Sequence, residues 1–364
     1  MQTANKQTIV SIQLLRVVAA LSVVYVHCAD GIVCRSFRTT GRFGVDIFFV
    51  ISGFVIAYVV SRGEGGAGNF LIKRVIRIEP MYLFVTIIMT LTAVIFPGLI
   101  KNNEVSVSGF IKSILFIPGP ENGGSPVLDQ GWTLNYEMLF YVVVFLCVLF
   151  AKNKRYLTIS CALALVFIMA VLQFGNTDNF ILNYYGPSMF LEFIYGIILY
   201  HLYTLFETTN RRISVNRWVK IIALASSAIF WYGFMIYCDM GDHYLSISRG
   251  IILGIPAAAV AGSVLFLEKE IRYDNKAIRF LAEIGEASYV MYLIHCLIIT
   301  FFAKVVFEEA SGTNCLFIYE IVKIIIVVIA TITFSILVHR FIDMPIQRYL
   351  KSLLKNRSSR GAVT

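Results

Sequence analysis

The chain has 364 residues, of which 58% are hydrophobic and only 15% are charged, and its formal net charge is +9. Soluble domains carry about a quarter charged residues, so this composition excludes an ordinary soluble protein and indicates a membrane protein. The positive charge does not indicate a nucleic-acid partner, because the basic residues concentrate between alternate pairs of hydrophobic stretches.

Ten hydrophobic stretches follow one another along the chain. Each is about as long as a helix needs to be to cross a ~30 Å hydrocarbon core. They cover residues 9–28, 43–61, 78–97, 132–150, 156–174, 184–204, 219–237, 249–267, 288–307 and 318–339. We therefore expect an all-α, polytopic transmembrane helix bundle of about ten spans. It should form one domain over residues 1–346, followed by a basic cytoplasmic tail over 347–364.

The distribution of basic residues predicts the orientation of these spans. With the N-terminus inside, the inner segments hold 22 Lys and Arg residues and the outer loops hold 6. Inner loops of membrane proteins are enriched in this way, so both termini are expected in the cytoplasm. The first stretch is too long for a signal peptide and lacks a small-residue cleavage site, so it should remain a span. Residues 105–118 are too short to cross and should be interfacial or re-entrant.

The first stretch contains an arginine, Arg16, and a histidine, His27. Eleven residues correspond to about 1100° of helical rotation and about 16 Å of rise, so both side chains should lie on one face. A charged side chain within a span is costly and indicates a functional site. The alternatives are a structural ion pair between Arg16 and Glu192, and an interfacial histidine at position 27.

Three carboxylates are candidate partners for His27. Asp30 is three residues further on, Asp46 begins the second stretch, and Glu137 lies one turn into the fourth, at the same expected membrane level. A carboxylate that orients the imidazole would make His27 a good general base for a hydroxyl near neutral pH. Each carboxylate could instead be a charge that stabilises a helix end.

Two arginines, Arg74 and Arg77, lie three residues apart in the segment FLIKRVIRIEP. We expect this segment to form a short basic amphipathic helix on the inner surface. Two guanidinium groups on one face suit a phosphate-rich ligand, and anionic lipid headgroups are the alternative. In the second stretch, GRFGVDIFFVISGF predicts close helix packing, with Ser52 able to hydrogen-bond within the membrane.

Aromatic and polar residues mark two further stretches. Trp132, Tyr136 and Tyr141 could form an interfacial aromatic belt or a surface on which a sugar stacks. Ser288, Tyr292 and His295 share one helical stripe in GEASYVMYLIH. His295 should lie near mid-membrane, where it needs a hydrogen-bond partner.

Together these motifs resemble the acyltransferase 3 family of membrane O-acyltransferases. The resemblance runs from about residue 10 to 346 and rests on five ordered motifs. They are the Arg16–His27 pair, GVDIFFVISGF, RVIR before IEP, GWTLNYEMLFY and GEASYVMYLIH. A Glu-x-Pro that often ends the family domain reads Asp343-Met344-Pro345 here. The resemblance implies that His27 is catalytic, that Arg16 is essential, and that Arg74 and Arg77 contact the phosphates of coenzyme A.

The expected function follows from this resemblance. The chain should move an acyl group, in the first place acetyl, from cytoplasmic acyl-CoA to a hydroxyl of a cell-surface polysaccharide or its lipid-linked precursor. Membrane lipid would surround it in the bacterial inner membrane, with no nucleic acid and no metal. We assign Asp30 and Glu137 to catalysis, Ser52 to donor binding, and Trp132, Tyr136, Asp46, Tyr292 and His295 to the acceptor. Direct transfer is expected, and an acyl-enzyme intermediate is the alternative.

Two other functions are compatible with the same residues. A transporter or flippase of polysaccharide precursors also needs polar residues inside a bundle of spans. An acyltransferase could also use succinyl-CoA. Four cysteines, Cys28, Cys34, Cys238 and Cys315, lie at or beyond outer ends of spans. A disulfide between them is possible on an oxidising face, and buried free thiols are the alternative.

Overall fold

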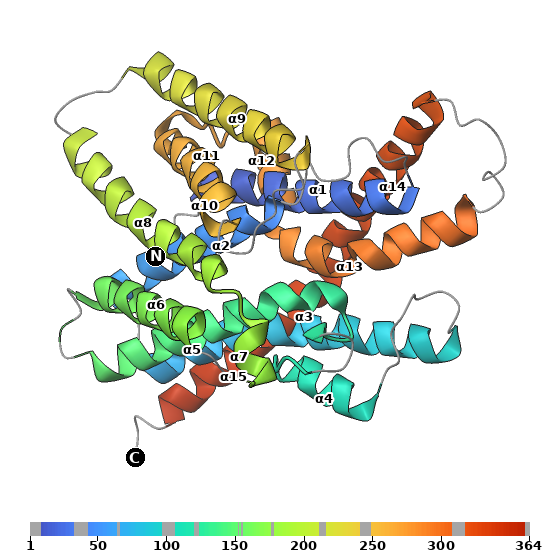
Figure 1. The fold of residues 1–364 in the computed structure, drawn as a ribbon, viewed down its shortest axis with the longest axis horizontal. Coiled ribbons are helices and arrows are strands. Elements are labelled where there is room, and N and C mark those ends of the chain that lie inside the picture. The colour runs from blue at the N-terminus through green and yellow to red at the C-terminus, as the bar shows by residue number, and fades with distance from the viewer. Residues whose placement is uncertain are drawn as a thin grey trace.

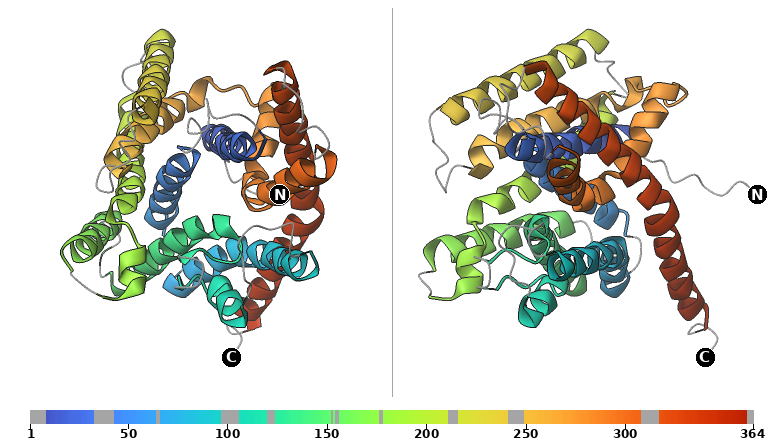
Figure 2. Two further views of the ribbon diagram at one scale, coloured as in Figure 1. Left: turned by 45° about the vertical axis from the view of Figure 1, so that its right-hand side comes forward. Right: turned by 90° about the vertical axis from the view of Figure 1, so that its right-hand side faces the viewer.

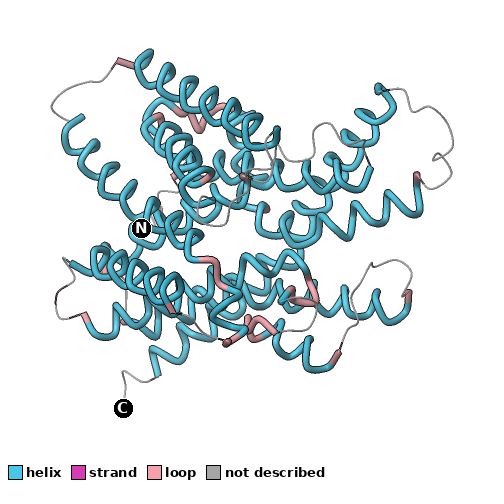
Figure 3. Tube along the Cα trace, viewed as in Figure 1, coloured by secondary structure: helices cyan, strands magenta, loops and turns pink. Residues whose placement is uncertain are grey.

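The computed structural model describes residues 9–32, 43–63, 66–96, 106–119, 124–151, 153, 156–175, 178–210, 216–240, 249–307 and 317–360. Within these ranges, the side chains at 29–32, 187, 209–210, 230–240, 317, 320 and 356–360 are not described. In this part of the chain the regular structure is helical throughout, and Figure 3 shows helices joined by short connections. The expected all-α bundle is confirmed.

The described part of the chain contains fifteen α-helices (Figure 1). They are α1 (Val10–Ile32), α2 (Gly44–Ser61), α3 (Ala67–Ile95), α4 (Val107–Ile114), α5 (Trp132–Phe150), α6 (Leu157–Phe174), α7 (Phe180–Tyr184), α8 (Phe190–Asn210), α9 (Arg217–Met240), α10 (Arg249–Ile252), α11 (Gly254–Phe266), α12 (Lys276–Glu286), α13 (Ser288–Phe301), α14 (Phe317–Val338) and α15 (Met344–Arg360). Short turns lie between some of them: the 3₁₀ turns η3 (Asp129–Gly131), η5 (Pro187–Met189) and η6 (Glu268–Glu270), and the π-helical turns η7 (Phe302–Val306) and η9 (His339–Asp343).

Nine segments of the described chain are long and apolar enough to cross a membrane. They correspond to nine of the ten expected spans. The tenth stretch, 219–237, lies within helix α9, whose side chains from residue 230 onward are not described. The segment expected to be too short to cross contains α4, a helix of 8 residues. Length and hydrophobicity therefore predicted the spans well.

Helix α3 differs from the expectation for residues 70–80. This segment is not a separate helix on the membrane surface, because it forms the first turns of a continuous helix of 29 residues with Pro80 inside it. Proline removes one backbone donor, and membrane helices tolerate this where neighbouring groups satisfy the freed carbonyl. The consequence is that Arg74 and Arg77 belong to a spanning helix and can point into the bundle.

The C-terminal helices also extend further than expected. Helix α14 continues through the π-helical turn η9 into α15, and the three form one long rod at the edge of the molecule (Figure 2, right). The domain boundary expected at residue 346 therefore falls inside α15. The His339 imidazole lies 2.8 Å from an Asp343 carboxylate oxygen within the π-helical turn. That contact stabilises the irregular turn, and π-helical turns occur often at functional sites.

Close backbone contact between α2 and α8 holds the centre of the bundle together. A Cβ atom added at Gly53 would lie 2.1 Å from the Phe193 carbonyl oxygen, and one added at Gly196 would lie 2.2 Å from that of Val50. Only glycine permits this approach. The expectation of tight packing from the second hydrophobic stretch is thus confirmed at Gly53.

The N-terminus of α1 is fixed by a residue far away in the sequence. The two carboxylate oxygens of Glu268 accept hydrogen bonds from the backbone amides of Val10 and Ser11, at 2.9 and 2.7 Å. A helix leaves its first amides without partners, and a carboxylate there also interacts favourably with the helix dipole. The cap sets the position of the helix that carries Arg16 and His27.

Candidate active site

One cavity lies among helices α1, α2, α3, α5 and α13 and encloses about 770 Å³ of space, part of which is open to the surroundings. Six residues that the sequence predicted for the site line it: Arg16, Ser52, Arg74, Arg77, Glu137 and Tyr292. Five helices are therefore needed to bring them together. The walls between them are mainly apolar and aromatic, as in many ligand pockets.

Arg74 lies at a cluster of polar groups on one wall of the cavity. Its guanidinium carbon is 5.7 Å from the ring centre of Phe70 and 5.9 Å from that of Tyr141. The Tyr141 hydroxyl donates a hydrogen bond to Glu137, and the Ser52 hydroxyl donates to the same carboxylate oxygen at 3.1 Å. This cluster joins α2, α3 and α5. Glu137 lines the same cavity as the three arginines, and His27 does not line it.

Two of the arginines present buried donors without partners. The Nε atoms of Arg16 and Arg74 are buried, and neither has a hydrogen-bond partner among the described residues. A buried donor left unsatisfied costs about 1–3 kcal/mol, and more for a charged group. The alternative of a structural ion pair between Arg16 and Glu192 does not fit the position of Glu192, which lies beside Asp46 and Arg249. An anionic ligand in the cavity would supply hydrogen-bond acceptors for the Nε donors of both arginines.

Tyr292 connects the cavity to a pair of histidines. Its hydroxyl donates to the carbonyl oxygen of Gln130 at 3.0 Å and lies 2.8 Å from the Thr133 hydroxyl. Its own carbonyl oxygen accepts a hydrogen bond from Nδ1 of His295 at 2.7 Å. The rings of His295 and His27 lie with their centres 4.9 Å apart. His27 and His295 therefore lie just behind Tyr292 and do not themselves line the cavity.

Of the three expected carboxylate partners of His27, two make other contacts. Asp46 is fully buried and its carboxylate lies 3.2 Å from the guanidinium of Arg249. Glu137 contacts Ser52 and Tyr141, as described above. The third expectation concerns Asp30, which belongs to the last turn of α1 and whose side chain lies outside the described residues. Asp46 therefore helps to tie α2 to α10 and does not line the cavity.

Trp132 and Tyr136 also lie outside the lining of the cavity. The Tyr136 hydroxyl accepts from the Gly186 amide at 2.7 Å and donates to the Tyr184 carbonyl at 3.3 Å. Its ring contacts Trp132 edge to face, at 6.1 Å between centres. These contacts hold the segment before α8 against α5. They are the contacts of a structural aromatic cluster, and the expected binding of a sugar by these residues stays a prediction.

Several cavity residues were not assigned to the site from the sequence. Tyr141 appeared only as a possible belt residue, although its hydroxyl contacts Glu137. Tyr289 is in contact with α3, because its hydroxyl donates to the Ile78 carbonyl at 2.8 Å. Thr133 bonds to Tyr292. Their signal was their position inside the motifs GWTLNYEMLFY and GEASYVMYLIH, close to residues that were selected. Cys296, next to His295, had no such signal.

Comparison with known proteins agrees with this arrangement. The family model described as an acyltransferase domain matches residues 9–340. The chain therefore belongs to the acyltransferase 3 family, and it is a multi-pass membrane O-acyltransferase by class. Membership of this family argues against the alternative function of a transporter or flippase.

Two relatives show how far the similarity extends. The exopolysaccharide production protein ExoZ of Rhizobium meliloti is 30% identical over 277 residues, which cover 73% of this chain and 79% of ExoZ. The peptidoglycan O-acetyltransferase OatA of Listeria monocytogenes is 26% identical over 94% of this chain. The match spans only 56% of OatA, about half of its length. No solved structure matches the chain.

Proposed function

We propose that this chain transfers an acyl group from cytoplasmic acyl-CoA to a hydroxyl of a cell-surface polysaccharide or of its lipid-linked precursor. Acetyl is the expected group, and the bacterial inner membrane is the expected location. The observation that carries the proposal is the cavity that Arg16, Arg74, Arg77 and Glu137 line together. The histidine pair lies next to it, behind Tyr292. The similarity to an exopolysaccharide production protein and to a peptidoglycan O-acetyltransferase supports a glycan acceptor.

The donor site is assigned to the arginines. Coenzyme A carries several phosphate oxygens, and guanidinium groups bind phosphate through paired hydrogen bonds. The unpartnered Nε atoms of Arg16 and Arg74 fit such an anion. Glu137 accepts hydrogen bonds from the hydroxyl groups of Ser52 and Tyr141, and the Tyr141 ring also contacts Arg74. The apolar walls formed by Phe48, Phe49 and Ile78 suit the uncharged arm of the donor.

The reaction is assigned to His27 as general base. His27 takes the proton of the acceptor hydroxyl while that oxygen bonds to the acyl carbon, and it returns the proton to the departing thiolate sulfur. An ester C–O bond forms and the thioester C–S bond breaks, so no other reactant is needed. A positioned base of this kind contributes about 10²–10⁴-fold in rate. His295, whose Nδ1 is held by the Tyr292 carbonyl, supports the His27 ring from one side.

Mass spectrometry of surface glycans tests the whole proposal. Cells that lack the gene should carry glycans lighter by one acyl group at a defined position, and the mass difference also distinguishes acetyl from succinyl. Complementation with the intact gene should restore the group, and complementation with His27→Ala should not. Loss of the entire glycan from the surface, with no change in its acylation, would support a flippase and contradict this proposal.

A further inference from the structure

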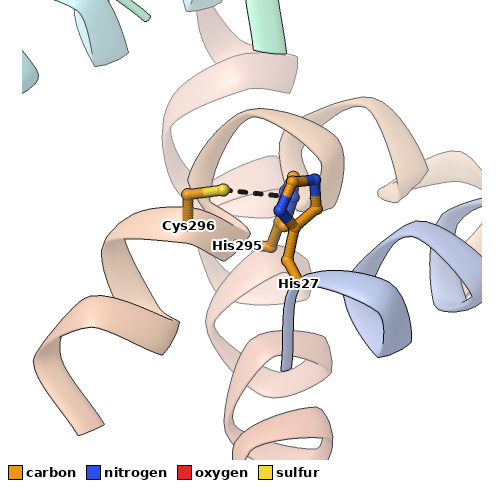
Figure 4. A group of neighbouring side chains, drawn as sticks. All are labelled: His27, His295 and Cys296. Atoms are coloured by element: carbon orange, nitrogen blue, oxygen red, sulfur yellow. Dashed lines mark hydrogen bonds between the residues drawn. The ribbon is translucent and has the colours of Figure 1, made fainter. Parts of the chain in front are cut away.

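The strongest unassigned feature is a group of three potential metal ligands, His27, His295 and Cys296 (Figure 4). One ligand atom from each residue lies within 4.8 Å of those of the other two. The Cys296 sulfur is 3.4 Å from Nε2 of His295, and the two imidazole rings are 4.9 Å apart. The three come from the last turns of α1 and the middle of α13, which pack against each other.

The hydrogen bonding of His295 prepares one of its nitrogens to bind a metal. Nδ1 lies 2.7 Å from the Tyr292 carbonyl oxygen, which can only accept a hydrogen bond. Nδ1 must therefore carry the proton, and the lone pair of the neutral ring is left on Nε2, the atom that faces Cys296. Histidine ligands of metals commonly donate their other ring N–H to a carbonyl in this way, which fixes the ring and its tautomer.

The kind of ligand set selects the metal. Two imidazoles and a thiolate suit Zn²⁺ and related transition metals, and they do not suit Mg²⁺ or Ca²⁺, which bind oxygen ligands. Three protein ligands also leave one position of a tetrahedral ion open. His295 is fully buried, whereas His27 and Cys296 are partly exposed. An ion can therefore reach the group from the side of His27 and Cys296.

We propose that His27, His295 and Cys296 form a Zn²⁺ site, and that an ion bound there stops acyl transfer. The second half rests on the proposed function, because a coordinated His27 has no lone pair left with which to take a proton. The first half depends only on the geometry of the three side chains. The site departs from the expectation of no metal. His27 and Cys296 are 269 positions apart in the chain.

Cobalt binding tests the site without any measurement of activity. The full chain, purified in detergent and treated with a chelator, is titrated with Co²⁺, which gives a near-ultraviolet charge-transfer band when a thiolate binds it. We expect one ion per chain and displacement by Zn²⁺. Cys296→Ser should lose the band, and His27→Gln should weaken Co²⁺ binding. The control is Cys147→Ser, which alters a partly buried thiol on α5 and should leave the band unchanged. No band in the intact chain, or an unchanged band in Cys296→Ser, would overturn the site.

Zinc titration of acyl transfer tests the inhibition. The intact chain should lose activity as Zn²⁺ is added and regain it with a chelator. Cys296→Ala should need at least about 10–100-fold more Zn²⁺, since even loss of a residue that only supports a ligand weakens metal binding by that factor. Binding without inhibition, or loss of transfer on removal of the metal, would overturn the second half. Acyl transfer measured without added metal tests the proposed function separately. The inhibition by Zn²⁺ and the proposed function can therefore be contradicted independently.

Discussion

At the scale of single residues, the charged side chains that line the cavity are those of Arg16, Arg74 and Arg77 and one carboxylate, Glu137. If the arginines bind the donor, replacing Arg74 and Arg77 together by Ala should raise the Kd for acyl-CoA by at least about tenfold, since a charge-assisted hydrogen bond contributes about 1.5–3 kcal/mol. Lys at either position should restore binding only in part, because it lacks the planar fork of donors. Calorimetry with a non-hydrolysable acyl-CoA measures both effects.

The matched control for the arginine variants is Arg62. It is exposed, lies over the ring of Tyr58 at 4.1 Å and does not line the cavity. Arg62→Ala should leave donor affinity unchanged. If it weakened binding as much as the double variant, the arginines would act through attraction to lipid headgroups and not through a defined site.

The variant Glu137→Gln distinguishes between two roles considered for this residue, one beside His27 and one beside Arg74. The sequence suggested a role beside His27, in which the variant would slow transfer and leave donor binding intact. The structure places Glu137 with Ser52 and Tyr141 beside Arg74. We therefore expect the variant to change KM for acyl-CoA together with kcat. A fall in kcat at constant KM would restore the first interpretation.

The sequence predicted six of the cavity residues. Arg16 was selected because a charged side chain inside a hydrophobic stretch is rare and costly, and Arg74 and Arg77 because two guanidinium groups on one helical face suit a phosphate-rich ligand. The sequence could not predict which residues the selected side chains contact. The contact of His27 with His295 joins α1 to α13, and that of Asp46 with Arg249 joins α2 to α10. Both depend on how the helices pack, and no local spacing encodes that.

At the scale of elements, the crossing of α2 and α8 depends on Gly53. Gly53→Ala places a Cβ 2.1 Å from the Phe193 carbonyl oxygen, so the helices must move apart. Overpacking of this kind destabilises by about 1–3 kcal/mol. Thermal unfolding in detergent should show a clearly lower Tm. Gly68→Ala, in the first turns of α3, meets nothing within 4 Å and should be neutral or stabilising, since Ala favours helices over Gly by about 0.5–1 kcal/mol. Equal effects of both variants would contradict the packing.

The position of α1 depends on the cap that Glu268 provides. Glu268→Ala leaves the amides of Val10 and Ser11 without their acceptors. Each unsatisfied buried group costs about 1–3 kcal/mol, less where water reaches it, so the Tm should fall. Asp274→Ala removes only an exposed contact with Arg272 and should stay within about 0.5 kcal/mol. An unchanged Tm in Glu268→Ala would show that the cap does not hold this helix.

The boundaries of the helices could be predicted from the sequence where hydrophobicity alone sets them. Elsewhere the predicted boundaries were wrong. The basic residues of FLIKRVIRIEP suggested a surface helix, but α3 runs through them because Arg74 and Arg77 face a cavity and not lipid. The tail after residue 346 is polar, yet α15 continues to Arg360. Its contacts with α3 add packing that the local sequence does not reveal.

At the scale of the whole molecule, the number and the order of the spans follow from lengths of hydrophobic sequence. The first turn of α1 and the last turn of α15 lie toward the same side (left in Figure 1), which agrees with an even number of crossings. We predict that reporters fused after Thr364 are active in the cytoplasm and that reporters inserted near Asn122 are active outside. A C-terminus on the outer face would contradict this topology and the cytoplasmic origin of the donor.

The central claim is that His27 performs the transfer while the arginines hold the donor, and its most direct test measures both in one variant. In proteoliposomes, His27→Ala should slow acyl transfer by about 10²–10⁴-fold. It should leave acyl-CoA affinity unchanged, because the proposal assigns donor binding to the arginines and only the proton transfer to His27. In the intact chain, the rate should rise with pH through one ionisation, as expected when the neutral imidazole is the active form. His27→Gln keeps size and hydrogen bonding but cannot accept a proton, so it should be as inactive as the alanine variant. A glutamine variant that transfers acyl groups at a near-normal rate would contradict the account.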